Sequence, residues 1–214
     1  AHAADKAEFA VRWDPSQGGP NTVEAVVTVL RQAGGKPKAS VVRYFSVAQP
    51  SRLPDGFAAI VRERTSDGEM ESTYKLRGPT QLPDSARKCP LKSGSGKSEV
   101  DISVLGSGSL KRSFSYSCSA DGNVKSRLPR RFHAKPLGCS SDVLRVEASD
   151  TNIESWSFPA GRKVLEVSWK GHDDSADLQS FLTRVVRPLT ATGVKPLGES
   201  KTSLGSGCSG PVSQ

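Results

Sequence analysis

The sequence predicts an α+β protein in which short strands and loops dominate and helices are few. Its 214 residues include 20 glycines and 14 prolines, and both residue types interrupt helices. Several segments alternate between apolar and polar residues, which is typical of a strand with one buried face. Hydrophobic residues make up only 35% of the chain. No stretch reaches the roughly 18 apolar residues that a membrane span needs. These observations argue against a helical bundle, a coiled coil and a membrane span.

The strands are expected where this alternation is clearest. Residues 8–13 place aromatic and branched side chains on one face and charged or small side chains on the other. Short turns rich in Gly, Asp and Ser separate the later alternating segments and indicate hairpins. Further strands are expected at residues 38–47, 57–65, 71–77, 99–105, 110–118, 143–148, 153–158 and 162–170.

Two helices are expected, one in each half of the chain. The first covers residues 21–33, with Asn21 as its N-cap and Gly34 just after its end. The second covers residues 176–192, where apolar side chains recur at helical spacing. Pro188 is expected to kink or shorten its last turn, because proline lacks the amide hydrogen that the helix needs.

The strands share an informative pattern, in which one face is apolar and the other carries charged side chains at two-residue spacing. This pattern fits an open sheet with a solvated charged face. It fits equally a sheet that closes so that the charged face lines a tunnel, where fixed cations would hold a polyanion. The cations in this pattern are Arg12, Arg62, Arg64, Lys75, Arg77, Arg145 and Lys170, and the acids are Glu8, Glu147 and Glu166.

The order of these segments resembles the CYTH superfamily, the triphosphate tunnel metalloenzymes. Residues 8–12 resemble the family's first strand, which carries Glu-x-Glu-x-Lys, and residues 60–64 resemble its Leu-Arg-x-Arg strand. The other matching segments are 21–33, 43–46, 53–56, 73–77, 165–170 and 199–202. The resemblance covers residues 8–78 well and 143–202 loosely, and it leaves residues 79–142 unmatched.

The resemblance implies a closed eight-stranded antiparallel tunnel with a few flanking helices, built as one domain over residues 1–204. It implies a triphosphate or polyphosphate ligand and a divalent Mg²⁺ or Mn²⁺ ion. Metal contact would fall to Glu8, Glu147 and Glu166, with Glu8 and Glu166 also catalytic in a metal-dependent triphosphatase. Phosphate contact would fall to Arg12, Arg62, Arg64, Lys75, Arg77, Arg145, Lys170 and Lys201.

The departures from the family pattern concern its acids more than its cations. Ala10 stands where the first strand has its second glutamate, and Ser168 stands where the late strand commonly has a second acid. Ser46 replaces an aspartate after Phe45. Magnesium is bound through carboxylates, substrate phosphates and water, so these losses favour anion binding over efficient hydrolysis.

Four cysteines at Cys89, Cys118, Cys139 and Cys208 suggest two disulfides and a secreted or periplasmic location. Three pairings are open, and the hairpin that Cys89 and Cys118 flank favours pairing these two, which leaves Cys139 with Cys208. Four free thiols in a cytosolic protein are the alternative. The cysteines lack Cys-x-x-Cys spacing, and with three histidines in the chain a zinc site is poorly supported.

A second function is also open, that of a non-enzymatic secreted protein that binds an acidic partner. The chain has a net charge of +8, and residues 125–135 carry a run of basic side chains. Aromatic side chains are sparse there, which makes nucleic-acid binding a weak hypothesis. Residues 205–214 are expected to form a Gly/Ser-rich tail, and the oligomeric state is left open.

Overall fold

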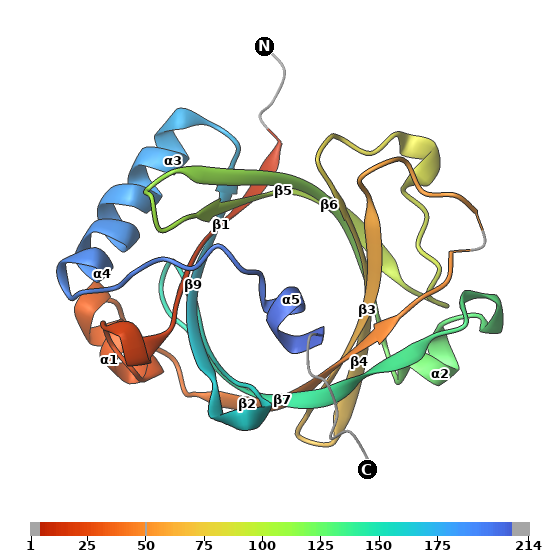
Figure 1. The fold of residues 1–214 in the computed structure, drawn as a ribbon, viewed down its shortest axis with the longest axis horizontal. Helices are drawn as coiled ribbons and strands as arrows, with labels where there is room; N and C mark the ends of the chain where they lie inside the picture. The colour runs from red at the N-terminus through yellow and green to blue at the C-terminus, as the bar shows by residue number, and fades with distance from the viewer. Residues whose placement is uncertain (1–4, 50, 207–214) are drawn as a thin grey trace. The chain divides into compact units, whose positions relative to one another are not determined.

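A computed structural model describes residues 5–49 and 51–206. Nine strands within these residues form a sheet that closes into a barrel, in the order β1-β5-β6-β4-β3-β2-β7-β8-β9 (Figure 1). The strands are β1 (Lys6–Trp13), β2 (Lys38–Ser46), β3 (Ala58–Ser66), β4 (Glu69–Gly78), β5 (Ser95–Val104), β6 (Leu110–Asp121), β7 (Lys135–Glu147), β8 (Asn152–Ser157) and β9 (Lys163–His172). The predicted α+β class with a closed, mainly antiparallel sheet is confirmed.

The expected count of eight strands is wrong, and the pairing of β1 explains how nine can close. Strand β1 pairs antiparallel with β9 but parallel with β5. A closed sheet in which every neighbour is antiparallel needs an even number of strands, because direction alternates around it. A parallel pair removes this requirement.

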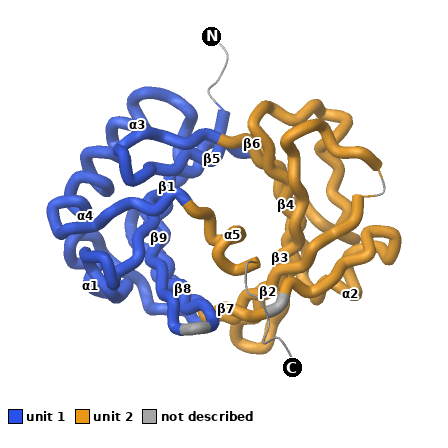
Figure 2. The backbone as a smooth tube through the Cα atoms, in the orientation of Figure 1, with its two compact units in different colours: residues 1–39, 99–112, 143–198 blue, residues 40–98, 113–142, 199–214 orange. Residues whose placement is uncertain are grey.

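The chain divides into two compact units (Figure 2). Unit 1 comprises residues 1–39, 99–112 and 143–198, and unit 2 comprises residues 40–98, 113–142 and 199–214. The expectation of a single domain over residues 1–204 stays a prediction. Each unit has its own apolar packing and is described separately.

In unit 1 helices cover the apolar face of the strands. Helix α1 (Val23–Leu30) packs against β8 and against α4 (Arg187–Ala191), and α3 (Ser175–Phe181) packs against β9. The Phe9 ring of β1 lies 5.6 Å from the Phe181 ring, measured between centroids. Phe9, Trp13 and Phe181 are fully buried. The apolar face predicted for residues 8–13 is therefore the core face of this unit.

The residues at which the helices begin and end differ from those predicted. Thr22, rather than Asn21, caps α1, because its hydroxyl accepts a hydrogen bond from the Ala25 amide at 3.1 Å. The helix ends at Arg31 in a left-handed conformation, three residues before Gly34. The predicted helix over residues 176–192 runs through α3, the π-helical turn η5 (Leu182–Val186) and α4. The wider π turn directly precedes Pro188, whose ring crowds the preceding helical turn.

In unit 2 the loops pack against the apolar face of β3, β4 and β6. Val61, Tyr74 and Cys118 lie in a buried cluster with apolar side chains from residues 82–91 and 124–132. The second of these segments contains α2 (Val124–Arg127) and a short 3-10 turn, η3 (Arg130–Phe132). Residues 79–142, which lie outside the family resemblance, therefore supply a large part of the core of this unit. Strand β7 begins at Lys135, eight residues before the predicted start at Val143.

The predicted pairing of Cys89 with Cys118 is confirmed, with 5.7 Å between their Cα atoms. None of the described cysteines is free, so the alternative of four free thiols is not supported. Cys208 lies outside the described residues, and with it the predicted Cys139–Cys208 pairing. Helix α5 (Lys201–Ser206) occupies the end of the described chain, and residues 207–214 of the predicted tail lie beyond it. Among the described helices, none is long and apolar enough to cross a bilayer.

Burial makes the unit 2 core sensitive to alkaline pH. Loss of hydration raises the pKa of Tyr74 and of Tyr116 above the ordinary value of 10.0. Their phenols therefore stay neutral in the folded chain while those of the unfolded chain ionise. The stability that this neutrality provides is complete below about pH 10 and is lost as pH rises through the folded pKa values. We expect the free energy of unfolding, measured in urea at pH 9 and pH 11, to fall less in Tyr74→Phe/Tyr116→Phe than in the wild type. An unchanged pH dependence in the variant would contradict this account.

Candidate functional site

The predicted cations of unit 2 gather on one face of the sheet. Strands β3 and β4 pair so that Arg62 lies opposite Thr73 and Arg64 opposite Glu71. Lys75 and Arg77 follow on the same face of β4, because side chains two residues apart on a strand point the same way. We call this face, with Arg62, Arg64, Lys75 and Arg77, the basic face. It is the opposite face from the one that carries Val61, Tyr74 and Leu76 into the core.

Strand β6 completes the basic face with hydroxyl groups. Ser115, Ser117 and Ser119 pair with Arg77, Lys75 and Thr73. The Thr73 and Ser119 hydroxyls lie 2.9 Å apart, and Arg62 Nη2 donates to Thr73 Oγ1 at 3.2 Å. All four cations are half-buried. The face therefore offers charged and hydroxyl donors at regular cross-strand spacing, which is an arrangement suited to phosphate oxygens.

Arg62 has a donor for which no described residue supplies an acceptor. Its Nη2 reaches Thr73 and lies 3.6 Å from Glu71 Oε1. Its Nε is buried and has no hydrogen-bond partner among the described residues. A buried donor without an acceptor is costly. An anionic ligand on this face would supply the missing acceptor.

The equivalent face in unit 1 carries charges of both signs. Register places Arg12, Glu166 and Glu154 side by side across β1, β9 and β8. Glu8 lies opposite Lys170 on β9 and Asp101 on β5. We call the face that carries these six residues the mixed face. Its acids outnumber its cations, in contrast to the basic face.

Arg12 is engaged within the protein. Its Nε forms an ion pair with Glu166 Oε2, and its Nη1 donates to Ser103 Oγ at 3.1 Å. The Arg12 side chain is 11% exposed and that of Glu166 only 3%. Glu154, the cross-strand neighbour of Glu166, accepts a hydrogen bond of 2.9 Å from the Trp156 indole. This row is thus a buried arginine beside two buried carboxylates.

The next row of the mixed face is neutral. Ala10 lies directly opposite Ser168 on β9 and opposite Ser103 on β5. Ser168 in turn lies opposite Asn152 on β8. Ala10 and Ser168, the two strand positions where the family pattern has acids, are therefore cross-strand partners, and both are buried. The two departures from the family pattern therefore lie next to each other in space. They form an uncharged row between two rows of charged side chains.

The other predicted residues are Arg145, Glu147, Lys170 and Lys201, of which Lys170 belongs to the mixed face. Arg145 on β7 donates to Asn152 Oδ1 at 2.8 Å and lies 3.2 Å from Glu147 Oε1. The Glu147 side chain is 60% exposed. Lys170 is exposed near the end of β9, and Lys201 begins α5. The binding and catalytic roles expected for all of these residues stay predictions.

The acids expected to hold a divalent ion do not form a compact ligand set. Within residues 5–49 and 51–206, Glu8, Glu147 and Glu166 do not bring three ligand atoms within 4.8 Å of one another. Glu166 is paired with Arg12 and Glu147 with Arg145. Two further carboxylates of the family pattern are missing at Ala10 and Ser168. The residues present thus do not fit a preformed magnesium site.

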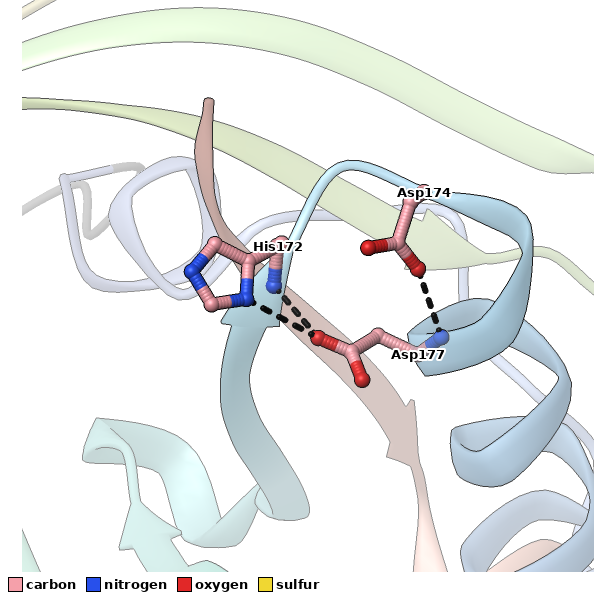
Figure 3. A group of neighbouring side chains, drawn as sticks. All are labelled: His172, Asp174 and Asp177. Atoms are coloured by element: carbon pink, nitrogen blue, oxygen red, sulfur yellow. Dashed lines mark hydrogen bonds and ion pairs between the residues drawn. The ribbon is translucent and has the colours of Figure 1, made fainter. Parts of the chain in front are cut away.

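A different group does meet that distance test, where β9 meets α3. His172, Asp174 and Asp177 each place a ligand atom within 4.8 Å of the others (Figure 3). Their contacts have a structural explanation, because Asp174 caps α3 by accepting from the Asp177 amide at 2.8 Å. Asp177 accepts from the His172 amide at 2.7 Å. A side chain on Gly171 would collide with Asp177, since its Cβ would lie 2.6 Å from Oδ2.

Sequence reasoning missed three acids on these faces, namely Glu154, Asp101 and Glu71. Asp101 pairs with Glu8 of the distant strand β1, whereas Glu71 and Glu154 pair with strands that are adjacent in the sequence. Glu154 carries no clear local signal, because β8 has only two apolar residues, Ile153 and Trp156, and they lie on opposite faces. Its burial depends on the packing of the whole strand.

Comparison with known proteins identifies the fold but no family. No family model and no curated protein matches the sequence. Among solved structures, a "putative adenylyl cyclase" from Hippeastrum, described as having a dominant triphosphatase activity, is similar with a TM-score of 0.53 and 14% identity. That match covers 98% of this chain and 99% of the other. A protein from Vibrio parahaemolyticus described as a "putative adenylate cyclase" has a TM-score of 0.50 and 8% identity over 95% of this chain and 98% of its own. At these identities the likeness is one of fold alone, and it agrees with the closed, mainly antiparallel sheet described above.

Proposed function

We propose that this protein binds a linear phosphate anion of the triphosphate or polyphosphate class, and that the basic face holds it. The observation that carries this proposal is the buried Arg62 Nε without an acceptor, on a face with three further half-buried cations. Guanidinium groups bind phosphate oxygens through charge-assisted hydrogen bonds. The fold shared with the Hippeastrum protein, which is described as a triphosphatase, supports the same ligand class.

The other predicted phosphate contacts are proposed separately from the basic face. Arg12, Arg145, Lys170 and Lys201 remain predictions in that role. So do the catalytic roles of Glu8 and Glu166 and the metal contacts of Glu8, Glu147 and Glu166. Binding is the core of the proposal, and hydrolysis is a separate property that a phosphate-release assay with Mg²⁺ and with Mn²⁺ measures.

Calorimetric titration with tripolyphosphate tests the proposal. We expect Arg62→Ala/Lys75→Ala to weaken binding by at least about tenfold, because each lost charged hydrogen bond contributes about 1.5–3 kcal/mol. The affinity should also fall with ionic strength. A wild type that does not bind tripolyphosphate, or a variant that binds as tightly as the wild type, would contradict the proposal.

The matched control is Lys125→Ala/Arg131→Ala, which removes the same charge from the basic segment 125–135. Lys125 and Arg131 are exposed, and Arg131 lies over the Phe132 ring at 5.6 Å. Normal tripolyphosphate binding in this control is expected. The same control tests the second candidate, a secreted protein that binds an acidic partner through this exposed segment. Binding of a polyanion such as heparin that is lost in this control and kept in the basic-face variant would favour that candidate.

The proposed location is outside the cytosol. The Cys89–Cys118 disulfide is compatible with an extracellular or periplasmic site, because such bonds persist in oxidising compartments.

A further inference from the structure

A metal ion that binds phosphate would need free carboxylates on the mixed face. A cation of the protein itself, Arg12, already lies beside Glu166 there. We propose that Arg12 takes the place of a divalent ion beside Glu166, so that the protein binds its phosphate ligand without a metal. This inference rests on the proposed function and adds to it the form in which the ligand is recognised, as the free polyanion rather than as its magnesium complex.

The first support is the pairing of Arg12. Its guanidinium contacts Glu166 and Ser103 at once, and both charged side chains are almost completely buried. A metal ion on Glu166 would have to displace this guanidinium or lie beside it. Displacement would leave a buried cation without its partner, and adjacency would place like charges together, so both routes oppose metal binding.

The second support is the gap at Ala10 and Ser168. These residues are cross-strand partners, so the carboxylates that are missing from β1 and β9 are missing at the same point. The row that remains there consists of Ser103, Ala10, Ser168 and Asn152. Hydroxyl and amide groups without a carboxylate are weak ligands for magnesium, which is usually bound through one or two carboxylates.

The third support is that another predicted metal ligand is also engaged. Glu147 is paired with Arg145, and it is exposed rather than buried with Glu166. Arg145 Nε is buried without a hydrogen-bond partner among the described residues. A site that contains an arginine with an unused hydrogen-bond donor favours the binding of an anion over that of a metal cation. The electrostatics of both pairs thus favour direct contact between guanidinium groups and phosphate.

The experiment compares tripolyphosphate binding by the wild type in excess EDTA and in excess Mg²⁺. We expect the dissociation constant in EDTA to be within about threefold of that in Mg²⁺, or tighter, because magnesium lowers the charge of the ligand. Binding at least about tenfold tighter with Mg²⁺ would overturn the inference and leave the proposed function intact. An absence of binding in both conditions would overturn the proposed function itself.

A direct metal titration provides a second readout. Electron paramagnetic resonance with Mn²⁺ alone is expected to show no bound ion in the wild type that Glu166→Gln removes. A bound ion that is lost in Glu166→Gln would overturn the inference. Ser168→Asp, which restores one acid beside Ala10, is expected to gain Mn²⁺ binding, and the isosteric Ser168→Asn is its neutral control. Because Ser168 is buried, the folding of both variants is checked by circular dichroism, and the wild-type measurements decide the question if either fails to fold.

Discussion

Replacing Arg12 with methionine is expected to lower the free energy of unfolding by about 3–5 kcal/mol, because it leaves a buried carboxylate without its cation. Glu166 would then face Glu154 across the β8–β9 ladder without the guanidinium of Arg12. The measurement is urea unfolding at pH 7. Adding Glu166→Gln to the variant should recover part of the loss, since it removes the unpaired charge, and the double-mutant cycle measures the coupling.

The control for Arg12 is a less buried pair on the same unit. Arg112 lies 2.7 Å from Asp173, and the Arg112 side chain is 52% exposed while that of Asp173 is 18% exposed. Arg112→Met is expected to cost less than about 1 kcal/mol, because water and salt screen exposed pairs. Equal losses in Arg12→Met and Arg112→Met would show that burial of the Arg12–Glu166 pair is not what makes it important.

Removing the Cys89–Cys118 disulfide is expected to destabilise the protein by about 3–4 kcal/mol. The two cysteines are 29 residues apart in the sequence. Opening a loop of that length raises the conformational entropy of the unfolded chain, and this entropy corresponds to the free energy given above. The test is urea unfolding of Cys89→Ala/Cys118→Ala. The slope of the unfolding curve should also steepen, because the unfolded state without the cross-link exposes more surface.

The wild type under reducing conditions serves as the comparison for this variant. Reduction breaks the same bond without changing side chains in the core, so the stability of the reduced wild type should fall at least as far. A midpoint for the double variant that equals that of the oxidised wild type would contradict the expected role of the disulfide.

The strands were predictable where local alternation and burial coincide. Strand β1 has Phe9, Val11 and Trp13 in the core, as its period-two pattern predicts. The start of β7 was not predictable in the same way, because the residues around Lys135 are mostly exposed and lack alternation. The end of α1 was missed because Arg31 adopts a left-handed conformation, which sequence usually associates with glycine.

The basic face was more accessible to sequence reasoning than the mixed face. Arg62 and Arg64 lie two residues apart on one strand, so strand periodicity places both on the same face of it. Lys75 lies on the strand that follows next in the sequence. The Arg12–Glu166 pair and the Ala10–Ser168 gap depend on the register of β1 against β9, which joins opposite ends of the sequence. The family resemblance identified the departures separately, but only the register shows that they are adjacent.

The pairing of β1 with β9 has a consequence for how the chain acquires its structure. All the other strands lie between these two in the sequence, so the ring of hydrogen bonds cannot be completed until β9 has been synthesised. Contacts this distant in sequence form slowly. Until they form, β1 retains an open edge that another polypeptide could extend. Nascent chains that stop before β9 should therefore depend on chaperones and aggregate when these are withheld.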